Sequence, residues 1–179
     1  KTGFFLGSAW NYVGQLRVVP FGLERERIKE AKPDFNLLTG KRVQRLLPPI
    51  QRNRHKYQRG SLAILAGSKG MSGAAMLAGN ASLRAGAGIV RLLHPSEIQN
   101  ELTQAPIELL KVAYEHKGKN TKELLSIINA SKAAVIGPGM GCAKETASLL
   151  KELLSNIEVP TVLDADALNL LAKENFKLS

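Results

Sequence analysis

Cysteine is nearly absent from this sequence, since Cys142 is the only one in 179 residues. A single thiol excludes an internal disulfide framework and fits a reducing cytoplasm. Long apolar stretches are missing as well: no run of about 18 apolar residues occurs, which is what a membrane-spanning helix needs. The apolar segments near the start are too short for a signal peptide. The sequence therefore predicts a cytoplasmic protein without membrane contact.

Metal-ligand patterns are also lacking. The three histidines, His55, His94 and His116, share no motif, and no two of them have the spacing of a metal site. Aromatic residues make up 5% of the chain and are not interleaved with its basic residues. No named nucleic-acid-binding motif occurs either. We therefore expect neither a metal centre nor a nucleic-acid partner.

The positive charge is concentrated at the beginning of the chain. Residues 1–60 contain 13 Lys or Arg against 4 Asp or Glu, whereas residues 61–179 contain 12 against 11, within a net charge of +10. A basic arm can contact nucleic acid or membrane. Here we favour a solvated basic linker over 31–58, whose paired prolines deny it a long helix. The first residue is Lys rather than Met, so we expect a piece of a longer product.

The most informative stretch is 60–90, GSLAILAGSKGMSGAAMLAGNASLRAGAGIV. A short apolar run over 61–66, bounded by glycines, predicts a buried strand. Turn chemistry follows at 67–70, and Ser72 is a candidate N-cap for an alanine-rich helix over 73–84 that two glycines then end. A strand that runs through a glycine loop into a helix leaves backbone N–H groups free to bind anions and close-fitting ligands.

Strands and helices alternate in the rest of the chain. Strands are predicted at 89–94, 108–113, 133–136 and 160–164, and helices at 121–130, 144–154 and 167–172. This alternation implies the α/β class, with a mainly parallel sheet covered on both faces in a three-layer α/β/α arrangement. Because ligands bind beyond the carboxyl ends of the strands in such sheets, we place the candidate site at that edge.

Two motifs fall at this edge. The GPGMG loop over 137–141 lies between a strand and a helix, where Pro138 stiffens the turn and Gly139 keeps the surface bare for a ligand. A tight loop needed only for packing is the alternative. Asp164 and Asp166 follow the last predicted strand, and three interpretations are open: a carboxylate pair, metal ligands, or a helix N-cap with a first-turn acid.

Three stretches of the sequence resemble one known family. They are KYQRGSLAILAGSKGMSGAAMLAGNASLRAGAGIV at 56–90, VIGPGMG at 135–141 and VLDADALNLL at 162–171, in the same order as in that family. The family is that of the ADP- or ATP-dependent NAD(P)H-hydrate dehydratases, ribokinase-like enzymes that repair hydrated nicotinamide cofactors. The resemblance implies that residues 59–179 form the N-terminal half of such a domain, in a chain truncated at both ends.

The resemblance also implies roles for particular residues. It carries substrate contacts onto Ala74, whose small side chain lets a ligand touch the backbone, and onto Gly139, and it places Asp164 and Asp166 along the substrate cleft. The implied chemistry uses ATP or ADP, with Mg²⁺, to phosphorylate the 6-hydroxyl of the hydrated nicotinamide; elimination then restores NADH or NADPH. The family's catalytic Asp belongs to a G-T-G-D loop, which does not occur in these 179 residues. No catalytic residue is therefore expected here.

A shorter resemblance concerns the start of the chain. Residues 14–22 alternate as a strand does and resemble the last strand of the NAD(P)H-hydrate epimerase domain, which many bacteria fuse in front of the dehydratase. This implies that 1–30 is the tail of an epimerase-like domain, in a bifunctional enzyme that also interconverts the R and S hydrates. It further implies a K⁺ site in the epimerase part and a homo-oligomer, such as a tetramer.

Two other functions remain open from the sequence alone. A small-molecule kinase of the same ribokinase-like fold is one, although the GSKGMSGAA run favours the dehydratase. A non-enzymatic module that binds nucleic acid through the basic arm is the other. A salt-dependent shift of labelled DNA would reveal the latter, because phosphate contacts release counterions. Of the three we favour the dehydratase.

Overall fold

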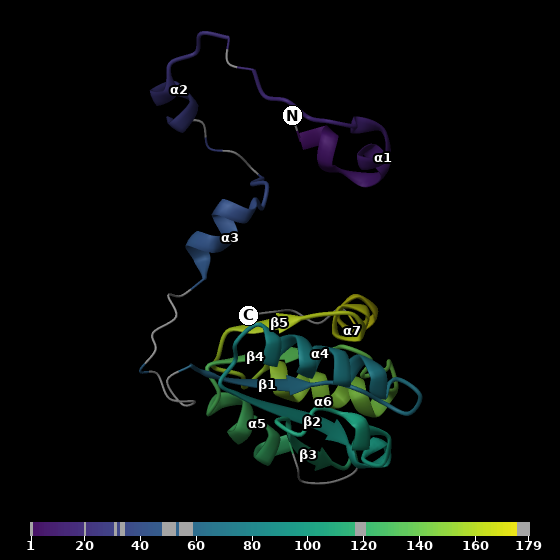
Figure 1. Ribbon diagram of the computed structural model, residues 1–179. Helices are drawn as coiled ribbons and strands as arrows, with labels where there is room; N and C mark the ends of the chain where they lie inside the picture. Colours follow the sequence, from purple (N-terminus) through teal and green to yellow (C-terminus); the bar gives the residue numbers. More distant parts are fainter. Residues whose placement is uncertain are drawn as a thin grey trace. The chain divides into compact units, whose positions relative to one another are not determined.

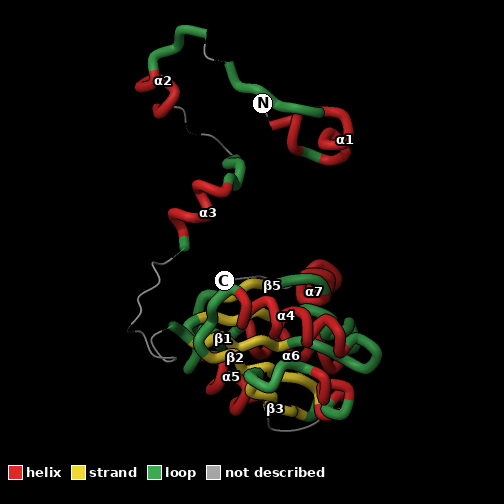
Figure 2. The backbone as a smooth tube through the Cα atoms, viewed as in Figure 1, coloured by secondary structure: helices red, strands yellow, loops and turns green. Residues whose placement is uncertain are grey.

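The computed structural model describes residues 2–19, 21–30, 32, 35–47, 53, 59–116 and 121–174. The chain divides into two compact units, Lys1–Ile50 and Gln51–Ser179. Figure 1 labels the elements of each unit, and Figure 2 separates helix, strand and loop by colour. The two units differ in kind, and each is described by itself.

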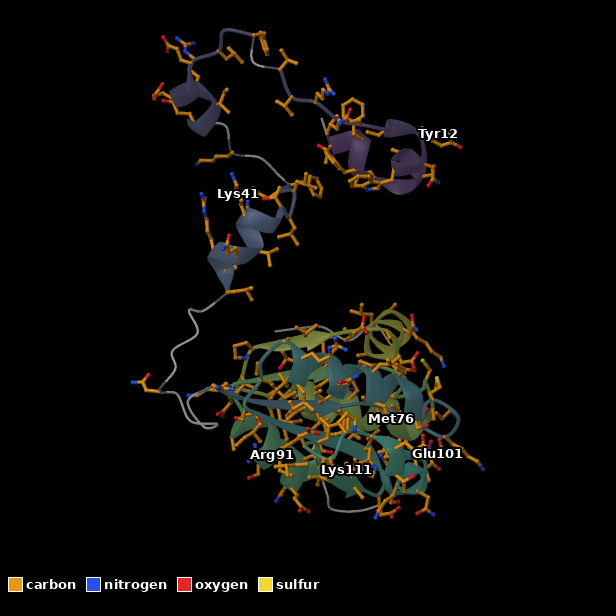
Figure 3. All side chains as sticks on the ribbon, in the orientation of Figure 1. Tyr12, Lys41, Met76, Arg91, Glu101 and Lys111 are labelled. Atoms are coloured by element: carbon orange, nitrogen blue, oxygen red, sulfur yellow. The ribbon has the colours of Figure 1, made fainter. Side chains whose placement is uncertain are left out.

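The first unit consists of short helices joined by irregular backbone (Figure 2). Two 3₁₀ turns, Thr2–Phe5 and Gly7–Ala9, precede the helices α1 (Trp10–Val13), α2 (Arg25–Glu30) and α3 (Gly40–Leu46). No residue of this unit whose burial is described is buried. Tyr12, for example, is 85% exposed, and its side chain extends away from the ribbon in Figure 3. Within its described residues, the unit therefore has no hydrophobic core.

The strand predicted over 14–22 is wrong. Those of its residues that the structure describes have irregular backbone, and Val18 and Val19 are 90% and 77% exposed. Alternation of apolar residues is a local pattern, whereas a strand needs a partner. The described part of the first unit contains no other strand to supply one.

The domain boundaries taken from the sequence remain predictions. The assigned epimerase-like tail, 1–30, lies in the first unit, and the assigned basic linker, 31–58, contains the end of that unit at Ile50. The helix α3 ends at Leu46, shortly before the paired prolines, as the linker assignment expects of a helix there. Most of 48–58, including His55, lies outside the described residues.

The second unit is built on a five-stranded sheet, drawn as arrows in Figure 1. Its strands are β1 (Ser61–Leu65), β2 (Ile89–Pro95), β3 (Leu110–Tyr114), β4 (Ala133–Ile136) and β5 (Thr161–Leu163). Their spatial order is β3-β2-β1-β4-β5, and every neighbouring pair is parallel. In the central strand, Ile64 lies opposite Leu92 of β2 on one side and Val135 of β4 on the other. The predicted parallel sheet is confirmed.

Helices cover both faces of this sheet. One face carries α4 (Ser72–Arg84) with the 3₁₀ turns Ser96–Ile98 and Glu101–Gln104, and the other carries α5 (Thr121–Asn129), α6 (Lys144–Leu154) and α7 (Asp166–Glu174). Neighbouring residues of β1 point to opposite cores: Ile64 packs with Ala75 of α4, whereas Leu65 belongs to the cluster that contains Leu150 of α6. This is the predicted three-layer α/β/α arrangement.

The element boundaries are close to those predicted, with two corrections. Ser72 is not an N-cap but the first residue of α4, and Met71, which precedes it, offers no side-chain cap. The strand β2 does not stop before Pro95 but includes it, opposite Tyr114 of β3. At Pro95 the strand pairs with β3 alone, because its pairing with β1 ends at Leu93. Nowhere in the described residues is a helix long and apolar enough to cross a membrane.

The strand β5 forms one edge of the sheet. It is three residues long, and Val162 in its middle is 60% exposed. Within the described part of the chain, β5 pairs with β4 alone. Its outer side therefore presents an apolar edge within the described residues.

Candidate functional site

The candidate site lies at the point in the sheet where the order of strand addition reverses. The chain continues from β1 to β2 on one side and later returns to place β4 on the other side of β1. The loops that follow β1 and β4 consequently leave the same edge of the sheet in neighbouring positions. In parallel sheets, a crevice at such a reversal is the usual place for a ligand.

Two hydrogen bonds join the loop after β1 to the GPGMG loop after β4. The Gly67 N–H donates to the Pro138 carbonyl oxygen over 2.9 Å. The Ser68 hydroxyl donates to the Gly139 carbonyl oxygen, also over 2.9 Å. One of these hydrogen bonds joins two backbones, and the other joins a side chain to a backbone. Together they hold the two loops side by side.

Two of the predicted substrate contacts, Ala74 and Gly139, touch each other. Gly139 has a φ of +61°, and a Cβ at this position would lie 2.8 Å from the Ala74 Cβ and 3.0 Å from the Met71 carbonyl oxygen. The bare surface of Gly139 is therefore filled by the start of α4 rather than left open. A larger side chain at either residue would push the GPGMG loop away from α4. Their role as substrate contacts remains a prediction.

The loops after β4 and β5 are equally close. Gly137 has a φ of +128°, and a Cβ there would lie 1.8 Å from the Asp164 carbonyl oxygen, so only glycine fits. The Asp164 N–H donates to the Ile136 carbonyl oxygen over 3.0 Å. The Asp164 side chain itself is exposed, and no other described residue forms a hydrogen bond with its carboxylate. Asp164 thus offers a free carboxylate next to the GPGMG loop.

The Asp166 carboxylate forms hydrogen bonds, whereas that of Asp164 forms none within the described residues. Its carboxylate accepts a hydrogen bond from the Gly141 N–H over 2.9 Å and another from the Asn169 side-chain amide over 3.2 Å. The Cys142 thiol lies 3.7 Å from the same carboxylate. Asp166 is the first residue of α7 and follows Ala165, whose φ of +46° is unusual for a residue with a side chain. This carboxylate therefore fixes the end of the GPGMG loop to α7.

The structure bears on the three interpretations of Asp164 and Asp166. The position of Asp166 in the first turn of α7 matches that of a first-turn acid. No group of three or more His, Cys, Asp or Glu suitable for a metal ion is found within the described residues. Whether Asp164 or Asp166 touches a substrate remains a prediction.

A cavity of about 350 Å³ opens beside the joined loops. It is lined by residues that follow four of the five strands: Ser68 and Lys69 after β1, Glu97 after β2, His116 after β3, and Met140, Gly141, Cys142, Ala143, Glu145 and Thr146 after β4. None of the four predicted contacts lines it, but Gly141, which Asp166 holds, does. The cavity and the predicted contacts therefore meet at the GPGMG loop.

One polar atom in the cavity wall is buried without a partner within the described residues. The His116 Nδ1 is buried and forms no hydrogen bond within the described residues, while its ring packs edge-on against Tyr114 with centroids 5.3 Å apart. Thr146 is only 2% exposed, and no described residue forms a hydrogen bond with its hydroxyl. The sequence analysis predicted no role for His116 or Thr146. It considered histidines only as pairs with metal-site spacing. The available signal was the position of His116 just after a strand.

Two ionisable groups at or near the cavity, Tyr114 and Cys142, have raised pKa values. Burial raises the pKa of Tyr114 well above its ordinary value, and the neighbouring Glu97 carboxylate adds to the rise. Desolvation also raises the pKa of the Cys142 thiol, and the Asp166 carboxylate raises it further. Both groups are therefore protonated at neutral pH.

The sequence pattern of the NAD(P)H-hydrate dehydratase family matches residues 62–179, which contain every loop of this site. The chain belongs to the NAD(P)H-hydrate dehydratase family. It is 35% identical over 173 residues to the bifunctional NAD(P)H-hydrate repair enzyme Nnr of Coxiella burnetii, covering 97% of this chain and 34% of that protein. It is 38% identical over 119 residues to the ADP-dependent (S)-NAD(P)H-hydrate dehydratase of Xanthomonas campestris pv. campestris, covering 64% and 41%. The chain thus spans about a third of the bifunctional relative.

Solved structures share the fold of this chain. A ribokinase-like superfamily protein of Enterococcus faecalis superposes with a TM-score of 0.64 at 22% identity, over 73% of this chain and 45% of that one. The ADP/ATP-dependent NAD(P)H-hydrate dehydratase of Bacillus subtilis, co-crystallised with ATP/Mg²⁺, superposes with a TM-score of 0.59 at 26% identity, over 73% and 46%. The predicted ribokinase-like fold and the predicted family are both confirmed.

Proposed function

We propose that the protein takes part in nicotinamide-nucleotide repair, as the substrate-side half of an enzyme that dehydrates (S)-NAD(P)H-hydrate to NAD(P)H at the expense of ATP or ADP with Mg²⁺. The observation that carries this proposal is the family match over 62–179, which includes the loops at the carboxyl edge of the sheet, where parallel sheets usually bind ligands. The names of relatives from Coxiella burnetii and Xanthomonas campestris support the substrate.

In this proposal the described residues bind and orient. The start of α4 around Ala74 and the GPGMG loop around Gly139 form the surface against which the hydrated nicotinamide lies. Asp164 offers an exposed carboxylate at the next loop, and Asp166 keeps the loop in place through the Gly141 N–H. ATP or ADP supplies the phosphoryl group that makes the 6-hydroxyl a leaving group, and elimination restores the reduced nicotinamide.

The test of this proposal is the absorbance of the reduced nicotinamide when purified hydrate, nucleotide and Mg²⁺ are mixed with protein. The protein of 179 residues should give no turnover, because these residues lack the G-T-G-D loop that would supply the general base. Loss of a general base typically lowers the rate about 10²–10⁴-fold. A product of the same reading frame that carries this loop should be active. Rapid turnover by the 179 residues would contradict the assignment of chemistry.

We propose a second activity beside the dehydratase. The alignment with the bifunctional repair enzyme of Coxiella burnetii includes the first unit as well as the second. This supports an epimerase that interconverts the R and S hydrates, with its K⁺ site, in front of the dehydratase. An assay with pure R hydrate tests it, because epimerisation must precede any dehydration of that isomer.

Kinase activity is the alternative outcome of the same assay. If nucleotide is consumed only with a sugar alcohol or vitamin and never with hydrate, the small-molecule kinase gains support. We further propose a cytoplasmic homo-oligomer that binds neither nucleic acid nor membrane. Light scattering measures its mass, and a gel shift with labelled DNA at low salt tests the basic arm.

A further inference from the structure

The cavity beside the GPGMG loop is not explained by the residues predicted to contact the substrate. It measures about 350 Å³, within the size range of small-molecule sites. None of Ala74, Gly139, Asp164 and Asp166 lines it. Residues that follow β1, β2, β3 and β4 all converge on it, which is the arrangement expected of a ligand site at the carboxyl edge of a parallel sheet.

The strongest sign that this cavity binds a ligand is a buried polar atom without a partner. The His116 Nδ1 is buried and unpaired within the described residues, and Thr146 is 2% exposed with no hydrogen bond to its hydroxyl among them. Buried polar groups are normally paired, because leaving one unpaired forfeits its hydration. The two residues come from different segments, the loop after β3 and the first turn of α6, yet line one cavity.

The remaining lining residues define the chemistry of the occupant. Glu97 and Glu145 present two exposed carboxylates, which accept hydrogen bonds from hydroxyl groups, and Lys69 presents one exposed ammonium. Met140, which is buried, supplies an apolar floor. Hydroxyl groups next to a ring, with a phosphate within reach of a flexible lysine, describe a nucleotide. An acidic residue after the second strand is also the group that binds a ribose 2′-hydroxyl in dinucleotide-binding sheets.

We propose that this cavity binds the adenosine half of the dinucleotide, with Glu97 and Glu145 accepting from its ribose hydroxyls and with Thr146 and His116 completing the contacts. The proposal rests on the proposed function, which supplies a dinucleotide substrate. Its consequence is selectivity. A 2′-phosphate would lie against two carboxylates, and like charges at close range repel. The protein should therefore prefer NADH and its hydrate to NADPH and its hydrate.

The test uses NADH and NADPH themselves, since both bind without needing the dehydration to proceed. Isothermal titration of the purified protein should give a Kd for NADPH about tenfold or more above that for NADH. The double variant Glu97→Gln with Glu145→Gln should reduce this ratio to below about threefold. Glu158→Gln is the matched control, because Glu158 is an exposed carboxylate just before the amino end of β5, and it should leave the ratio unchanged.

Thr146 provides a second readout that separates ligand binding from a structural role. Thr146→Val should weaken NADH binding about fivefold while leaving the melting temperature unchanged or slightly raised, because the hydroxyl has no partner in the described structure. Thr146→Ser should restore binding. In addition, NADH should shift the His116 ring signals in the proton NMR spectrum.

Several results would overturn this proposal. Equal Kd values for NADH and NADPH would remove the selectivity, and unchanged His116 signals would mean that the cavity holds only water. Failure of the proposed function is distinguishable from these results. Selective NADH binding without any dehydration by an extended product would refute the repair activity but keep the cavity assignment. Dehydration by an extended product that binds NADH and NADPH equally would support the repair activity but refute the cavity assignment.

Discussion

The two units of this chain have similar apolar residues and use them in opposite ways. In the first unit Val18, Val19 and Phe21 are at least 77% exposed, whereas in the second Ile64, Leu92 and Leu150 are fully buried. The difference does not lie in the residues but in what surrounds them. The second unit has five parallel strands with helices on both faces, so each apolar side chain meets another layer. Apolar content alone therefore does not specify a core; alternating elements that can pack in layers do.

Limited proteolysis should sharpen this contrast most strongly. We expect the first cuts within 36–58, because polar, proline-containing connections open easily, whereas cutting inside the second unit requires unfolding. With an unfolding free energy of about 5 kcal/mol or more, the rates should differ by roughly 10³-fold. Mass spectrometry of a trypsin time course locates the cuts. Early cleavage inside 61–170 with 36–58 intact would show that the domain boundary is misplaced.

A glycine substitution made in each unit should give the next largest contrast. Gly137→Ala should destabilise the second unit by about 4 kcal/mol or more, because its Cβ would lie 1.8 Å from a carbonyl oxygen in a left-handed backbone. Gly14→Ala is the matched variant: its φ is +60°, but nothing lies within 4 Å of the added Cβ. It should leave the main transition unchanged. Urea unfolding followed by circular dichroism measures both. Equal effects would contradict the assigned packing.

Within the second unit, the two aspartates allow a finer comparison. Asp166→Ala should cost about 1–3 kcal/mol, because the Gly141 N–H loses a charged acceptor. Asp164→Ala should change stability by less than about 0.5 kcal/mol, since its carboxylate is exposed. Thermal unfolding of both variants against the unmodified protein gives the difference. A greater loss at Asp164 would show that the assignment of the two carboxylates is reversed.

The smallest expected effect is a dependence of folding stability on pH, which only the second unit should show. His94 is 1% exposed, and burial lowers its pKa below 6.5, with a further contribution from Lys111. Below about pH 6.5, His94 therefore binds a proton more readily in the unfolded chain than in the folded chain. Stability falls as the pH drops below about 6.5 and recovers above it. Titration of the His94 ring by NMR should give a midpoint below 6.5. A midpoint at or above 6.5 would remove this contribution.

Local patterns were enough to predict much of the second unit. The bounds of β4 and α6 agree with the sequence analysis because each element is short, strongly apolar or amphipathic, and ended by glycine or by polar residues. The same reasoning failed at 14–22, where the pattern was present but a partner strand was not. Periodicity describes what a segment can do, and only tertiary structure decides whether it does so.

The site was predictable in its motifs but not in its contacts. The sequence analysis placed the GPGMG loop at the ligand-binding edge of the sheet, but it did not predict the hydrogen bond between Ser68 and Gly139, which joins residues 71 positions apart. It also did not predict that the Cys142 thiol lies beside the Asp166 carboxylate, 24 positions further along the chain. It also read Gly139 as a bare surface, which α4 in fact fills. Such contacts depend on how loops meet after the sheet has formed, and no local signal encodes them.

The central place of β1 has a consequence for synthesis. This strand is the first of the sheet to be made, yet one of its two neighbours is β4, which ends at Ile136. At about 5–20 residues per second, a ribosome needs roughly 4–14 seconds to extend the chain from Leu65 to Ile136. During that interval one side of β1 lacks its native neighbour. The nascent chain therefore depends on β2 and α4, which follow β1 directly, to cover this apolar strand until the second neighbour emerges.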